Sequence, residues 1–243
     1  MKKNKNITLK SGLIEQDEKW SGNILITGDI VISENAKVVV KPGTTIRFCN
    51  QSDLKFSEKK YRLKELLKDF NIQKEPYMDR CSIIVNGSFF ICGNIDKRII
   101  VGNNEWKGCV FVRKNASVKF KYVDITGGFG IVFDHESKLS VIDGCLIQQC
   151  CLAIVSFSKI IVKNTIIRFN EIGVICYKKS LIYRNKIYEN MYKGIFLNSD
   201  YGYLIDNAVI LNENGIEIFK SSKIIIKKNR IANNNNGIIV RQS

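Results

Sequence analysis

The chain has 243 residues, of which 45% are hydrophobic, 25% are charged and only two are proline. This balance indicates a globular protein with one substantial core or two small ones, and no segment approaches the ~18 consecutive apolar residues that span a bilayer. The net charge of +15 favours anionic partners such as nucleic acid, acidic polysaccharide or a lipid surface, although a compositional bias toward Ile, Lys and Asn explains it equally well.

The amino-terminal residues 1–20 are basic, and no apolar stretch of secretory length follows them. We expect them to form an N-terminal segment or cap. As the sequence stands, it predicts a cytoplasmic protein, with export by another route left open.

Residues 21–48 and 83–112 contain short runs that are typical of strands. The first range ends in "KPGTTIRF", where Pro42 and Gly43 form a turn ahead of a strand, and the second contains a W-x-G motif at 106–108.

The segment 56–80 departs from this strand pattern. Leu63, Leu66, Leu67 and Phe70 recur at helical spacing, and Ser57 is a suitable N-cap. The pattern predicts an inserted amphipathic helix of about 12 residues. Its apolar face would dock on the neighbouring strands, or it would act as a mobile lid or a partner-binding helix.

The remainder of the chain is repetitive, with rows at 159–179, 180–201, 202–222 and 223–243 and looser rows at 117–133 and 138–158. Asparagines at 164, 185, 207 and 229 recur at steps of 21, 22 and 22, and glycines at 173, 194, 215 and 237 recur at 21, 21 and 22. In the row 138–158, Gly144 replaces the first asparagine and Ala153 replaces the glycine. Such a period indicates one structural unit per row, stacked on its neighbours.

Each row holds three apolar runs of two to four residues, which are too short for helices. Three short strands per row describe one coil whose strands pair in parallel with the coils above and below, ~4.8 Å apart. An asparagine at the same corner of every coil then stacks on its neighbours through side-chain amide hydrogen bonds. Asn170, Asn190, Asn212 and Asn234 predict a second stack.

These rows resemble the right-handed parallel β-helix repeats of the pectin-lyase-like superfamily, in the form shared with NosD-like proteins. The "KPGTTIRF" turn and the W-x-G motif are similar to the extended first part of bacterial β-helix proteins. The resemblance implies an all-β, right-handed parallel β-helix of roughly nine coils over residues 21–243, with the helical insertion at about 56–80. It implies little about function, because the architecture hosts lyases, hydrolases, epimerases, adhesins and non-catalytic binders.

The eight cysteines lie mostly in apolar runs, none forms a C-x-x-C pair, and His135 is the only histidine. We therefore expect no metal site and no cofactor, and interpret the cysteines as buried thiols. Disulfides and a reactive thiol remain alternatives.

The residues after each corner glycine predict an outward row along the coils. Its members are Val132, Val155, Ile175, Phe196, Glu217 and Ile239. Five of the six are apolar, so we expect the inserted helix, another subunit or a ligand to cover them. Strand propensity alone also explains branched residues there.

The triplet Asp134-His135-Glu136 is faintly similar to the D-P-H-D motif of alginate epimerases, in which a histidine abstracts a proton next to a carboxylate. Here the proline is absent and the second Asp is Glu. His135 and Asp134 are the catalytic candidates, and a solvated histidine in a turn is the alternative.

Tyrosines and basic residues gather in two successive rows and predict a binding patch for sugar rings or a polyanion. The candidates are Tyr183, Arg184, Tyr188, Tyr192, Lys193 and Tyr203. Ordinary surface tyrosines are the alternative.

The sequence thus favours a non-catalytic scaffold or binding protein for a polymeric anionic ligand, such as polysaccharide, or for a protein partner. A polysaccharide-active enzyme of lyase or epimerase type is the first alternative. A self-assembling structural protein is the second, because an outward apolar row and the edge of the last coil could join subunits.

Overall fold

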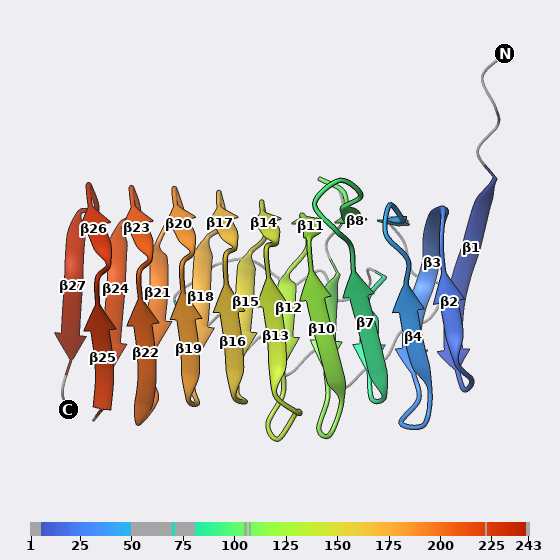
Figure 1. Ribbon diagram of the computed structural model, residues 1–243, viewed down its shortest axis with the longest axis horizontal. Helices are drawn as coiled ribbons and strands as arrows, with labels where there is room; N and C mark the ends of the chain where they lie inside the picture. Colours follow the sequence, from blue (N-terminus) through green and yellow to red (C-terminus); the bar gives the residue numbers. More distant parts are fainter. Residues whose placement is uncertain are drawn as a thin grey trace, which may run out of the picture.

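The computed structural model describes residues 6–49, 70, 81–104, 106, 108–221 and 223–241. They form an all-β, right-handed solenoid of about nine coils in which every described strand pair is parallel, as the repeats predict. Figure 1 shows the coils stacked side by side along the longest axis, from β1 (Ile7–Ile14) at one end to β27 (Asn236–Arg241) at the other. No helix occurs in the described residues.

One strand of each coil contributes to a nine-stranded sheet, which we call the front face because it lies in front in Figure 1. Its strands are β2 (Glu18–Trp20), β4 (Lys37–Val40), β7 (Ser88–Cys92), β10 (Ser117–Lys121), β13 (Ser140–Asp143), β16 (Ile160–Lys163), β19 (Ser180–Tyr183), β22 (Tyr201–Ile205) and β25 (Lys223–Lys227).

The other strands form an 18-stranded sheet that bends into two faces. The upper face consists of β5 (Thr45–Phe48), β8 (Ile99–Gly102), β11 (Val123–Thr126), β14 (Leu146–Gln148), β17 (Ile166–Arg168), β20 (Lys186–Tyr188), β23 (Ala208–Ile210) and β26 (Arg230–Ala232). The rear face consists of β6 (Ile83–Val85), β9 (Cys109–Val112), β12 (Gly130–Phe133), β15 (Leu152–Ser156), β18 (Ile172–Cys176), β21 (Lys193–Leu197), β24 (Asn214–Phe219) and β27. β1 and β3 (Asn23–Ile32) run through both faces.

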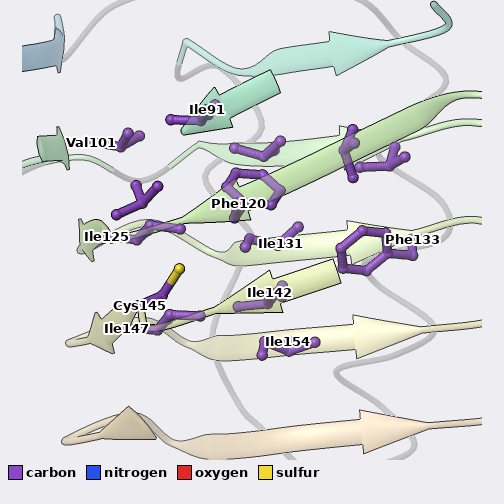
Figure 2. Close-up of a cluster of buried hydrophobic side chains, with 14 of the residues drawn as sticks. Ile91, Val101, Phe120, Ile125, Ile131, Phe133, Ile142, Cys145, Ile147 and Ile154 are labelled. Carbon is purple, nitrogen blue, oxygen red and sulfur yellow. The ribbon is translucent and has the colours of Figure 1, made fainter. Parts of the chain in front are cut away.

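The hydrophobic core fills the inside of the solenoid. Alternation along each strand turns every second side chain inward, and parallel pairing places these side chains above one another in successive coils. Figure 2 shows Phe120, Ile125 and Ile131 from three faces meeting inside, and all three are fully buried. Burying each such side chain contributes about 1.5–3 kcal/mol, so stacking many coils stabilises strands that are too short to be stable alone.

The two predicted asparagine stacks are confirmed at the corners on either side of the upper face. In one of them, Asn190 Nδ2 donates to Asn212 Oδ1 at 2.9 Å and to the carbonyl oxygen of Ile167 at 3.3 Å. Its Oδ1 accepts from the backbone nitrogen and Nδ2 of Asn170, at 3.2 and 2.9 Å. These buried amides therefore find partners in the adjacent coils.

The register predicted for the other stack is wrong at its first member. Thr165, not Asn164, occupies the position below Asn185, and its backbone nitrogen donates to Asn185 Oδ1 at 3.0 Å. Asn164 is the preceding corner residue, with φ of 50°, and its exposed side chain donates to Asp143. One coil earlier, Cys145 stands in the stack while Gly144 takes the positive φ, so Gly144 does not replace an asparagine.

The glycine column is confirmed, and close backbone approach explains it. A Cβ added to Gly194 would lie 2.7 Å from the carbonyl oxygen of Gly215, and one added to Gly173 would lie 2.5 Å from that of Gly194. Ala153 occupies the equivalent position on β15, as expected.

The helix expected within 56–80 lies outside the described residues, apart from Phe70, and is not confirmed. The insertion lies between β5 and β6 in the chain; the described residues that flank it are Cys49, after β5 of the upper face, and Cys81, before β6 of the rear face. Trp106 of the W-x-G motif stacks on Phe48 with ring centroids 4.2 Å apart, and its Nε1 donates to the carbonyl oxygen of Cys81 at 2.9 Å. This buried tryptophan therefore contacts both flanks of the insertion.

Residues 7–20, expected as an N-terminal segment or cap, form a coil of their own through β1 and β2. All eight cysteines are free thiols, and Cys81, Cys109, Cys145, Cys150 and Cys176 are buried. Burial raises the pKa of the Cys145, Cys150 and Cys176 thiols to about 12, so these thiols remain protonated at neutral pH.

Candidate binding surface

The outward side of the front face is basic. Alternation turns 21 side chains outward from its nine strands, and seven of them are lysines whereas one, Asp143, is acidic. The seven are Lys19, Lys37, Lys119, Lys121, Lys163, Lys223 and Lys227. Lys159 and Lys179, which immediately precede β16 and β19, are also exposed. The face therefore presents a surplus of positive charge along the solenoid axis.

An uncharged column runs along the middle of this face. Pairing registers place Val141, Ile161, Leu181, Tyr203 and Ile225 next to one another on five successive strands. We call them the apolar column. The first four are half-buried, and Ile225 is 48% exposed, so the column remains open to solvent over its whole length.

Lysines flank the apolar column on both sides. The lower lysine column, at the start of the strands, consists of Lys159, Lys179 and Lys223, with Tyr201 between the last two. The upper lysine column, at the end of the strands, consists of Lys121, Lys163 and Lys227. Asp143, Tyr183 and Ile205 occupy the positions between them, and Lys121 lies one coil before the apolar column begins. Strand geometry separates each lysine column from the apolar column by two residues, or about 6.6 Å.

Few of these lysines have an acidic partner within the described part of the chain. Lys163 Nζ lies 3.4 Å from Asp143 Oδ2, and this carboxylate, together with the Tyr183 hydroxyl, raises the pKa of Lys163. Lys179 and Lys223 instead lie over the rings of Tyr203 and Tyr201, 5.7 and 5.5 Å from the ring centroids. Their charges are therefore available to an anionic ligand.

A groove of about 740 Å³ follows the edge between the rear and front faces. It spans the turns of four coils, and its lining includes His135, Phe157, Tyr177, Tyr201 and the lower lysines Lys159 and Lys179. The groove thus adjoins the lower lysine column.

Aromatic rings stack along the wall of this groove. The Phe157 and Tyr177 rings are 4.6 Å apart and 6° from parallel, and His135 lies 5.0 Å from Phe157. The Ser137 hydroxyl, also in the lining, is buried without a hydrogen-bond partner among the described residues.

The two catalytic candidates have different surroundings. Asp134 is 9% exposed, and its Oδ1 accepts from the backbone nitrogen of His135 at 2.6 Å, so this carboxylate holds the turn. The His135 ring is exposed in the groove. Glu136 pairs with Lys114 at 2.6 Å, and the hydrogen bond from Lys114 lowers the pKa of the Glu136 carboxyl. In the part of the chain described, no group of three or more His, Cys, Asp or Glu residues could hold a metal ion.

The six residues predicted as a binding patch lie on different faces. Tyr183 and Tyr203 belong to the front face, but Arg184 sits at the corner, 3.5 Å from Asp206. Tyr188 lies on the upper face, where its hydroxyl accepts from Arg168 at 3.0 Å. Tyr192 and Lys193 lie at the rear face. The structure therefore brings only two of the six to the basic front face.

The predicted outward row runs along the rear face, and pairing extends it at its amino-terminal end through Phe111, Ile84 and Val31 to Leu13. We call this row the rear column. It is covered over most of its length: Val132, Val155 and Ile175 are fully buried and Phe196 is 8% exposed. Phe70, from the insertion, packs edge-on against Phe196 with ring centroids 5.1 Å apart.

The one acidic member of the rear column is paired. Glu217 is 4% exposed, Lys193 Nζ contacts its Oε2, and Arg241 Nε donates to its Oε1 at 3.0 Å. Lys193 also lies over the rings of Phe70 and Phe196. Both cations named here therefore share the one carboxylate of Glu217.

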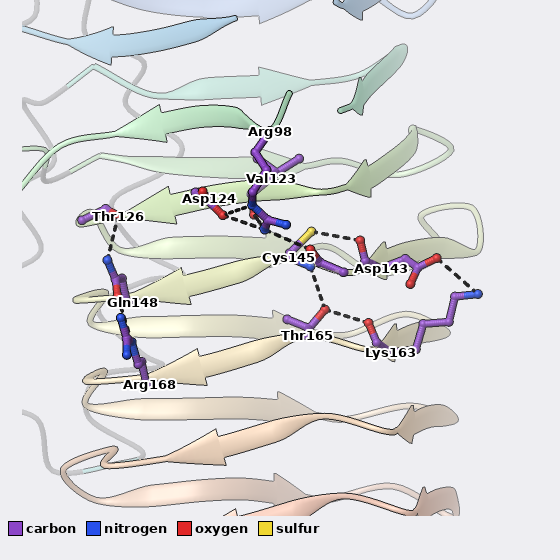
Figure 3. Close-up of polar contacts among 11 residues, drawn as sticks. Arg98, Val123, Asp124, Thr126, Asp143, Cys145, Gln148, Lys163, Thr165 and Arg168 are labelled. Carbon is purple, nitrogen blue, oxygen red and sulfur yellow. Dashed lines mark hydrogen bonds and ion pairs between the residues drawn. The ribbon is translucent and has the colours of Figure 1, made fainter. Parts of the chain in front are cut away.

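The upper face likewise uses its polar groups internally, as Figure 3 shows. Arg168 Nε donates to Gln148 Oε1 at 3.0 Å, and Gln148 Nε2 donates to the Thr126 hydroxyl at 3.4 Å. Arg98 pairs with Asp124 at 2.6 Å. The upper face also exposes Lys186 and Arg230. The front face differs in having more exposed lysines, which align in columns on both sides of an uncharged column.

Sequence reasoning missed the lysine columns, although a signal was present. Lys159 and Lys179 each stand immediately before a short strand whose residues alternate between the two sides. These lysines are 20 residues apart, and Tyr201 and Lys223 follow at further steps of 22. Reading residues by their place in the coil, rather than by proximity along the chain, would have aligned them.

The model of the right-handed β-helix region matches residues 108–243, more than half of the chain, and the chain belongs to this family. No curated protein and no solved structure matches the chain. The described residues include no helix long and apolar enough to cross a membrane.

Proposed function

We propose that this protein is a non-catalytic β-helix binding protein whose front face and adjoining groove hold a polymeric anionic ligand, most naturally an acidic polysaccharide. The observation that carries the proposal is the pair of lysine columns, which lie along the solenoid axis with little acidic compensation. A polymer laid along this axis meets several lysines at once, so many weak contacts add up.

Salt-dependent binding tests the proposal. Binding of acidic polysaccharides to the immobilised protein should weaken as salt rises, and a neutral polymer of the same length should not bind. The triple variant Lys159→Ser, Lys179→Ser, Lys223→Ser should lower the slope of log K against log salt by about one unit per lysine.

A matched control removes three positive charges elsewhere. Lys186, Lys228 and Arg230 are exposed on the upper face or its corner. The triple variant Lys186→Ser, Lys228→Asn, Arg230→Ser has the same net charge as the front variant. If both variants lose binding equally, net charge rather than the front face is responsible and the proposal fails.

A second candidate, a polysaccharide-active enzyme of lyase or epimerase type, is favoured by one observation: the exposed His135 lines the groove. Such an enzyme would release chain ends from an acidic polysaccharide or change its sugar configuration, which reducing-end assays and NMR of the polymer detect. Turnover that disappears in His135→Ala at unchanged stability would replace the binding proposal with this one.

A further inference from the structure

We infer that the ligand of the front face is a flat, ribbon-shaped polyanion of sugar rings that lies along the solenoid axis and carries acidic groups on both of its edges. This proposal rests on the polyanion-binding function proposed above, and it specifies the shape of the ligand. It is argued from the order of the three columns across the face.

The apolar column defines where uncharged ring faces would lie. Val141, Ile161, Leu181, Tyr203 and Ile225 continue without a charged residue over five coils. Pyranose rings have an apolar face formed by their C–H groups, and aliphatic and tyrosine side chains offer a complementary surface. A helical polymer turns its charged groups toward this column at intervals, whereas a flat ribbon keeps them at its edges.

The lysine columns define where the acidic groups would lie. They flank the apolar column on both sides, at about 6.6 Å, so a ligand with charges on a single edge would leave one column unused. In a two-fold ribbon successive rings are turned over, and acidic groups alternate between the edges.

Part of the spacing along the axis agrees with such a ribbon. Lys121 and Lys163 are two coils apart in the upper column, with Asp143 between them, and Lys179 and Lys223 are two coils apart in the lower column. Lys159 and Lys179 are one coil apart and Lys163 and Lys227 are three, so these neighbours do not follow the two-coil repeat. Two coils span ~9.6 Å at the strand spacing of ~4.8 Å. A pyranose in an extended β-linked chain advances by a length close to one strand spacing, so the acidic groups on each edge of a two-fold ribbon recur about every two coils.

Other occupants of this face fit less well. A second copy of the chain would bring lysine columns against lysine columns. A lipid surface is entered by apolar side chains that project beyond the charged ones, whereas Ile161, Leu181 and Tyr203 are half-buried between longer lysines. Single-stranded nucleic acid binds by stacking successive bases on aromatic rings, and the apolar column offers one ring, that of Tyr203, among four aliphatic side chains.

The test compares two polymers with the same charge per sugar and different shapes. Polymannuronate is a flat, β-linked ribbon, and polyguluronate is its buckled C5 epimer. Calorimetry with purified fragments of equal length, in low salt without divalent cations, should give at least tenfold tighter binding of polymannuronate. The double variant Leu181→Ser, Tyr203→Ser should remove most of this preference and retain the salt slope, because its lysines are intact.

The outcomes separate the two proposals. Equal or tighter binding of polyguluronate overturns the ribbon and leaves polyanion binding in place. No binding of either polymer overturns both proposals, as does binding to vesicles of anionic phospholipid combined with no binding to the polymers. The comparison of the two polymers uses the unaltered protein, so it remains valid even if the double variant fails to fold. The control for that variant is a second double variant on the upper face, Ile166→Ser, Tyr188→Ser.

Discussion

The front and rear faces have the same pattern of outward side chains, but they differ in how much of that pattern other residues cover. Each carries a column of apolar side chains along its outward positions, with lysines nearby. At the rear face the column is buried, Phe70 packs on it, and Lys193 and Arg241 neutralise Glu217. At the front face the column is half-exposed and most of the flanking lysines are unpaired. Alternation therefore fixes which side chains point outward, and the rest of the chain decides which outward surface stays open.

The largest expected effect comes from breaking the covered face. Ile175 on β18 is fully buried in the rear column, so Ile175→Ser should lower the free energy of unfolding by about 3–5 kcal/mol, through lost burial and an added polar group. The matched variant Ile161→Ser, on the half-exposed apolar column, should cost less than about 1 kcal/mol. Urea unfolding measures both, and equal losses would contradict the difference in cover.

Self-assembly through the rear column stays a prediction. In the single chain, Val132, Val155 and Ile175 are already buried, which leaves the partly exposed Ile239 at one end of the column and Leu13, 60% exposed, at the other. If light scattering finds a defined oligomer, Ile239→Asp should dissociate it, because a charge would enter the contact. An oligomer that withstands this change would use another surface.

A smaller effect is expected from removing one charge on each face. Glu217 is almost completely buried between Lys193 and Arg241, so Glu217→Gln should cost about 2 kcal/mol by leaving Lys193 without its anion. Asp143→Asn on the front face removes a more exposed partner of Lys163 and should cost less than about 1 kcal/mol. Thermal unfolding at two salt concentrations distinguishes them: added salt should reduce the loss in the front variant and leave that in the rear variant nearly unchanged.

The periodicity of the sequence determines how much of the fold could be predicted from it. Asn185, Asn207 and Asn229 recur with the coil and gave the correct corner, because stacking requires the same residue at the same place. Asn164 was misplaced by one position, because asparagine also suits the left-handed corner residue that precedes the stack. The two positions differ in backbone conformation and in burial, and the residue type alone reveals neither.

The binding surface was harder to predict, since neighbours along the chain are separated in space by the corners. Tyr188 and Tyr203 stand close together in sequence and lie on different faces, whereas Lys159 and Lys179 are 20 residues apart and adjacent in the structure. In the rear column, Phe196 is covered in part by Phe70, which lies outside the repeat. A repeat alone carries no information on what packs against it.

The smallest effect concerns a thiol on the open face. Cys92 lies at an outward position of β7, beside Lys121, and its burial raises the pKa of the thiol while Lys119 and Lys121 lower it. Lys119→Ser should therefore raise this pKa further, reduce the thiolate fraction at pH 8 and slow alkylation of Cys92 by iodoacetamide by a factor of a few. Lys186→Ser, on another face, should leave the rate unchanged, and Cys150, buried at the rear corner, should remain unmodified throughout. Peptide mass spectrometry over a time course measures the alkylation of Cys92 and Cys150 in the unaltered protein and in both variants. A rate that is insensitive to Lys119 would mean that the front lysines do not act on groups in their own face, and would weaken the case that they act jointly on a ligand.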